Sequence, residues 1–132
     1  MALTLERSLK IVQGAEKKAA QLNVKVTIAI VDAGGRLIAL HRMDGAPFPT
    51  PEIAQGKAFT AVSFGAESAQ LMNMLGQVPF FANGPQLAGG RFTLMPGGVP
   101  ISEGNAVVGA VGVAGATGEQ DVECAKEGLA AR

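Results

Sequence analysis

The only histidine of the chain, His41, lies in a stretch whose alternation is typical of a β-strand. Imidazole works near neutral pH as a general base or as a metal ligand. Successive side chains of a strand point to opposite faces, so we expect His41 to share a face with Leu37, Ala39 and Met43. Two interpretations stay open: His41 is a candidate catalytic base, or it is a structural residue whose hydrogen bonds are satisfied within the fold.

Two cations that follow this histidine in the sequence are further candidates. The planar guanidinium of Arg42 could clamp a carboxylate, or it could form a salt bridge with Asp44 that pins the strand end. Lys57 follows Ile53 by four residues and precedes Ala61 by four, which places it on or beside the apolar stripe of a helix. In a pocket, Lys57 could bind an anion or act as a base or Schiff-base nucleophile, whereas the alternative is a stem that carries its ammonium to solvent.

A glycine-rich segment in the second half of the chain supplies the remaining candidates. Gly97 and Gly98 could bring backbone N–H groups against a ligand, and Glu103 stands nearby as an acid or base. The same residues are also typical of an ordinary turn and a hairpin tip. Phe80 and Phe81 lie in an irregular loop that is long enough to suggest a functional role besides connecting two elements. We therefore expect a pocket between Arg42, Lys57, this stretch and the two glycines.

Composition excludes several classes of function. Eleven basic and eleven acidic residues balance and form no run of one sign, so nucleic acid and membrane surfaces are not expected partners. A lone cysteine, Cys124, excludes an internal disulfide framework, favours the cytoplasm and behaves as a small buried hydrophobe. No two-histidine spacing, Walker sequence or nucleophile elbow occurs, so we predict no fixed metal site. No stretch of about 18 apolar residues is present to span a bilayer.

Elements that would position these residues follow from periodicity and turn signals. Thr50, Pro51 and Glu52 predict a helix start with a hydroxyl N-cap, and that helix should run to about Phe64. Helices are also expected at 5–22, 68–75 and from Glu119 onward, and strands at 24–31, 36–43, 91–95, 99–102 and 105–114. The predicted fold is α/β (α+β): one compact domain over 1–132, with a five-stranded antiparallel sheet flanked by helices.

Four segments carry a family likeness: VDAGGRLIALHRMDGAP (31–47), PEIAQGKAFTA (51–61), GGVPI (97–101) and VVGAVGVAGA (107–116), with Asp121 beyond the last. In order and spacing they resemble the GlcG/HbpS family, to which the C-terminal domain of PduO also belongs. The resemblance covers nearly the whole chain and implies a five-stranded sheet with helices on both sides. It also implies assembly into homo-oligomers, from dimers to rings such as octamers.

Members of that family are linked to haem binding, haem degradation and iron capture, and others accompany catabolic enzymes. The resemblance therefore implies a small-molecule binder for haem or a related anionic planar ligand. If haem binds, His41 and Met43 are the candidate iron donors that this strand offers. The alternative is a small catabolic enzyme of the tautomerase, hydratase or decarboxylase type. It would act on an organic acid with Lys57, His41 or Glu103 as acid and base. A third reading is a scaffold oligomer with neither ligand nor turnover.

Overall fold

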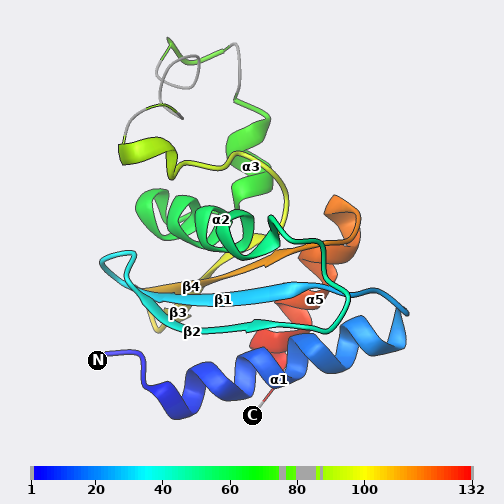
Figure 1. Ribbon diagram of the computed structural model, residues 1–132. Coiled ribbons are helices and arrows are strands. Elements are labelled where there is room, and N and C mark those ends of the chain that lie inside the picture. The colour runs from blue at the N-terminus through cyan, green and yellow to red at the C-terminus, as the bar shows by residue number, and fades with distance from the viewer. Residues whose placement is uncertain (1, 75–76, 80–85, 87, 132) are drawn as a thin grey trace.

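An antiparallel four-stranded sheet separates two layers of helices (Figure 1). The computed structural model describes residues 2–74, 77–79, 86 and 88–131. Its strands lie in the order β2-β1-β4-β3, with α2 and α3 on one face and α1 and α5 on the other. The elements are α1 (Leu5–Gln21), β1 (Thr27–Asp32), β2 (Leu37–Arg42), α2 (Thr50–Phe64), α3 (Ser68–Met72), the 3-10 turn η2 (Ala88–Gly90), β3 (Gly98–Glu103), β4 (Ala106–Ala114) and α5 (Gly118–Ala130).

The prediction of five strands is wrong, because residues 91–95 do not join the sheet. The backbone N–H of Thr93 donates to the Thr60 hydroxyl on α2 at 2.7 Å instead of to a neighbouring strand. Phe92 in the same segment contacts the rings of Phe59 and Phe64, both on α2. The apolar residues of this segment therefore pack on a helix, and β3 remains an edge strand.

Capping side chains fix the starts of α1 and α5, whereas the start of α2 departs from the prediction. Thr4 caps α1 through Arg7 N–H at 3.1 Å, and Thr117 opens α5 with a capping box. The predicted hydroxyl cap at Thr50 is wrong, because Thr50 is itself the first residue of α2 and the cap position is Pro49. The Thr50 hydroxyl instead contacts Thr27 on β1 at 2.8 Å and so ties the start of α2 to the sheet.

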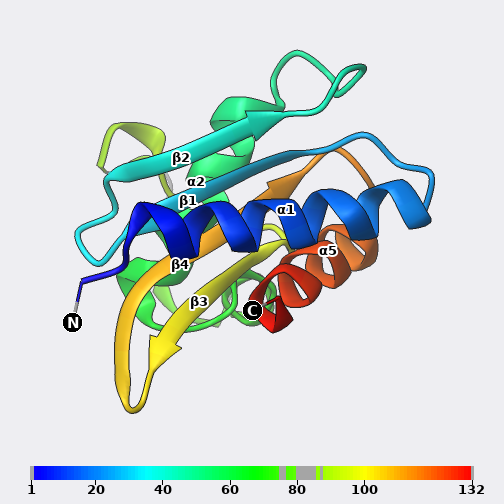
Figure 2. The same cartoon turned by 90° about the horizontal axis from the view of Figure 1, so that it is seen from below.

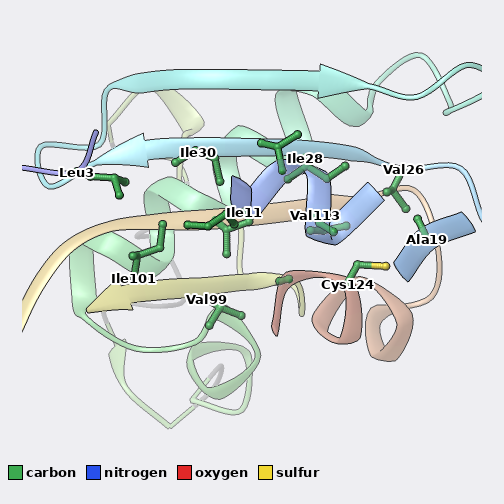
Figure 3. Packing of buried hydrophobic residues seen from close by; sticks show 14 of the residues in the cluster. Leu3, Ile11, Ala19, Val26, Ile28, Ile30, Val99, Ile101, Val113 and Cys124 are labelled. Carbon is green, nitrogen blue, oxygen red and sulfur yellow. The ribbon is translucent and has the colours of Figure 1, made fainter. Parts of the chain in front are cut away.

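The main core lies between the sheet and the α1/α5 layer (Figure 3). Ile28 and Ile30 of β1 and Val111 and Val113 of β4 are fully buried there, against Ile11 of α1. Figure 2 shows α1 and α5 side by side across this face of the sheet. Among the described residues, no helix is both long enough and apolar enough to cross a membrane.

The other face of the sheet receives α2 through small residues. A Cβ atom added at Gly112 of β4 would overlap the Ala54 carbonyl oxygen, and one added at Gly98 of β3 would overlap the Lys57 carbonyl oxygen. Ala54 and Ala58 of α2 are fully buried in this contact. The helix backbone therefore rests directly on the strand backbones, which only glycine permits.

Replacing Gly112 by Ala should force α2 away from the sheet and lower the free energy of unfolding by about 3 kcal/mol. Gly34→Ala is the matched control, because a Cβ there meets only Asp32 Oδ1 at an ordinary 3.5 Å. Urea unfolding of both variants checks this expectation. Equal stability of the two variants would contradict the close contact.

Candidate functional site

Strand β2 presents its candidates on two opposite faces of the sheet. His41 pairs in register with Ile28, whose side chain faces α1, and Arg42 pairs with Thr27, which faces α2. A register shift between Ile30 and Val31 then reverses the alternation toward the start of the strand. The prediction that Leu37 shares the face of His41 is therefore wrong, because Leu37 lines a cleft on the α2 side.

His41 is held from one side by an acidic residue of α1. Its Nδ1 lies 2.9 Å from Glu16 Oε1, and the two side chains are 44% and 33% exposed. The described residues offer no partner to the other ring nitrogen, Nε2. Met43 lies next to the same face but is half-buried and packs against the main core. This leaves His41 with one oriented nitrogen and one nitrogen available to a ligand.

Arg42 closes the loop that follows β2. Its Nε and Nη2 both donate to the Ala46 carbonyl, at 3.2 and 2.8 Å. Among the ion pairs of the described chain none joins Arg42 to Asp44, so the anticipated salt bridge is replaced by this loop contact. Arg42 remains exposed and keeps further N–H groups for a ligand.

Lys57 is buried, and its ammonium is held by two acceptors within the fold. Its Nζ donates to the Val113 carbonyl at 2.8 Å and to Asp121 Oδ2 at 3.0 Å, and the two charged side chains are 2% and 3% exposed. The side chain runs past Gly97, where an added Cβ would lie 3.0 Å from Nζ. Gly97 and Gly98 thus make room for Lys57, and the lysine joins α2 on one face to α5 on the other.

Asp121 is the partner that reasoning from the sequence missed. It lies 64 residues from Lys57, and nothing local in the sequence links the two. Burial raises the pKa of the Asp121 carboxyl, while the Lys57 charge, the hydrogen bond from Lys57 and the Ala116 N–H act in the opposite direction. The carboxylate is retained in the interior by these partners, which is the usual condition for a buried charge.

The three proposed acid and base residues lie far apart in the fold. Glu103 is the last residue of β3 and pairs with Ala106 at one end of the sheet. His41 pairs with Ile28, which pairs in turn with Val113, near the other end. Lys57 is enclosed between α2 and α5. Phe80 and Phe81 lie outside the described residues. The chain therefore does not bring Lys57, His41 and Glu103 to one substrate.

A cleft that the sequence analysis did not anticipate lies beside α2. It has a volume of about 500 Å³ and is bounded by the β1–β2 turn, the start of β2, one side of α2 and residues 89–93. Its polar side chains are those of Arg36, Glu52, Gln55, Arg91 and Thr93. The two arginines follow Gly-Gly pairs in the sequence, at 34–35 and 89–90, which is the only local signal that both would lie at turns.

Removing one member of the buried ion pair should be strongly destabilising. Lys57→Met leaves the Asp121 carboxylate unpaired, so we expect a loss of about 3–5 kcal/mol in the free energy of unfolding. The double variant with Asp121→Leu should recover most of that loss. Lys126→Met is the control, because Lys126 is exposed and its pair with half-buried Glu67 at 3.4 Å should contribute less than about 1 kcal/mol. Denaturant unfolding that shows Lys57→Met as mild as the control would contradict the assignment.

Cys124 should be unreactive in the folded protein. Burial, and then the charges of Asp121 and Glu123, raise the pKa of its thiol to about 11. Since the thiolate is the reactive form, a disulfide reagent at pH 8 should label the native chain slowly and the urea-unfolded chain at once. Immediate stoichiometric labelling of the native chain would show that the thiol is accessible.

The sequence of this chain matches a known protein family and a relative in Escherichia coli. The family model described as haem degrading protein HbpS-like matches residues 3–130. GlcG of Escherichia coli K12 is 35% identical over 112 residues, which cover 84% of this chain and 80% of GlcG.

Two solved structures share the fold closely. A double mutant of HbpS from Streptomyces reticuli superposes with a TM-score of 0.91 at 34% identity, covering 98% of this chain and 86% of that one. The PduOC–haem complex superposes with a TM-score of 0.93 at 27% identity, covering 100% of this chain and 96% of that one. The chain belongs to the HbpS-like family, as the resemblance of its four sequence segments predicted.

Proposed function

We propose that this protein binds haem and that Nε2 of His41 would hold the iron. The observation that carries the proposal is the contact between His41 Nδ1 and Glu16 Oε1 at 2.9 Å. A carboxylate on one imidazole nitrogen fixes the tautomer, orients the ring and makes the other nitrogen a better metal donor. Support from outside the chain comes from PduOC, whose structure was solved with haem.

The surroundings of His41 suit a flat ligand that is apolar over most of its surface and anionic at one edge. Arg42, the next residue of this edge strand, points to the opposite face but is exposed, so a propionate that reached over the strand edge could accept hydrogen bonds from its remaining N–H groups. Phe48, in the loop after β2, is 84% exposed to solvent, which is unusual for a large apolar ring. These features extend the surface around the end of β2, where apolar contact would add to the iron bond.

We expect this surface to be completed by assembly of several copies into a homo-oligomer, from a dimer to an octamer. β2 is an edge strand of the sheet, so the outer hydrogen-bonding groups of its backbone have no strand partner among the described residues. Exposed Phe48 lies just beyond the end of this strand. A second copy that covered the strand edge and the loop would also shield a bound haem from water.

Catalysis on an organic acid through Lys57, His41 and Glu103 is not the function this geometry favours. The buried ammonium of Lys57 already has two acceptors, and Glu103 lies at the other end of the sheet. Binding through His41 alone needs neither of them.

A haem titration followed in the Soret band tests the proposal. Wild type should give a saturable shift with one haem per chain, and His41→Ala should weaken binding and change the band position. Glu16→Gln keeps the histidine but loses the orienting charge, so we expect an affinity reduced by about 10-fold to 100-fold. Lys10→Ala, which removes an exposed cation from the same helix, serves as the control.

Two outcomes would overturn the proposal. One is the absence of any saturable shift at micromolar haem. The other is an His41→Ala protein whose affinity and spectrum equal those of the wild type.

A further inference from the structure

We propose that the cleft between α2, the β1–β2 turn and residues 89–93 is a second binding site, for a small carboxylic acid. The cleft lies on the α2 side of β2, while His41 faces α1 on the other side of the same strand. Its volume of about 500 Å³ is within the range of small-molecule sites. The inference does not depend on haem binding, because the two sites share no residue.

Arg91 is the fixed cation of the cleft. Its guanidinium carbon lies 3.8 Å from the centre of the Phe59 ring, and its Nη2 donates to the Gly35 carbonyl at 3.0 Å. Stacking on an aromatic face and a backbone acceptor hold the planar group in one orientation. A guanidinium has five N–H groups, so most of them remain free to bind a ligand that enters the cleft.

The walls around Arg91 are held in place by α2. Thr93 N–H donates to Thr60 Oγ1 at 2.7 Å, and the Phe92 ring lies 5.2 Å from that of Phe59. Segment 91–93 is therefore anchored to α2 at two successive residues, Phe92 and Thr93. A site whose cation is oriented before the ligand arrives loses less entropy on binding.

Arg36, beside the β1–β2 turn, supplies a second cation to the cleft lining. Its side chain is exposed, and no hydrogen bond or ion pair of its guanidinium occurs within the described ranges. Two arginines against one acidic residue, Glu52, give the lining a net charge of about +1. That balance matches a monoanion better than a dianion, because the Glu52 carboxylate repels additional negative charge.

The remaining polar groups define the rest of the ligand. Glu52 offers a hydrogen-bond acceptor, and Gln55 and Thr93 offer both donors and acceptors. Val31 and Leu37 form an apolar part of the lining. The ligand that fits is a short-chain hydroxy acid. The two guanidinium groups would bind its carboxylate, and the Glu52 carboxylate would accept a hydrogen bond from its hydroxyl group.

Isothermal titration calorimetry on the haem-free protein tests this site with lactate, acetate, malate and inorganic phosphate as probes. We expect saturable binding of lactate, weaker binding of acetate because it lacks the hydroxyl, and weaker binding of the dianions malate and phosphate. Arg36→Ala should reduce lactate affinity by about tenfold or more, since it removes charge-assisted hydrogen bonds without breaking a described contact. Arg91→Lys should also reduce it, because the fork is lost while the charge is kept.

Lys10→Ala is the matched control, a cation removed from the far side of the molecule, and it should bind lactate like the wild type. No saturable heat with any probe at millimolar concentration would overturn the site, as would full lactate affinity in both arginine variants. Tighter binding of phosphate than of lactate would overturn the carboxylate assignment. None of these readouts depends on the Soret band, so failure here and failure of haem binding are distinguishable.

Discussion

The direct contact between the backbone of α2 and the backbones of β3 and β4 governs the rest of this structure. Gly98 and Gly112 allow it, because a Cβ at either position would overlap α2 carbonyl oxygens. The same closeness carries the Lys57 side chain past Gly97, where its ammonium meets Asp121 of α5. Lys57 is a catalytic candidate in the sequence, but in the structure it joins the two helical layers. Its charge is paired with Asp121 inside the fold.

This constraint also decides where ligands can bind. The face toward α1 and α5 is filled by branched aliphatic side chains, and the face toward α2 has no room over β3 and β4. Strand β2 lies at the opposite edge of the sheet and is less covered. It presents His41 with its Glu16 partner on one side, and Leu37 in the lining of the cleft that contains Arg36 and Arg91 on the other. Both proposed sites therefore belong to the one strand that the close contact leaves open.

Elements that depend on local signals could be predicted, and contacts between distant residues could not. The helix ending at Phe64, the hairpin around Gly34 and the long strand before Gly115 follow from caps, turns and alternation. Residues 91–95 have the alternation of a strand, but the segment packs on α2 and does not join the sheet. The register shift beside Val31 and the pairing of Lys57 with Asp121 depend on tertiary structure, so periodicity alone assigned Leu37 to the wrong face and left Lys57 undecided.

The most direct test of the central claim is a crystal structure of the haem-loaded protein, because it shows which atom holds the iron. We predict iron bonded to Nε2 of His41, with Glu16 still on Nδ1 and the cleft between Arg36 and Arg91 free of porphyrin. Iron held by any other residue, or porphyrin lying in the cleft with its propionates on those arginines, would contradict the assignment of haem to the α1 face of β2.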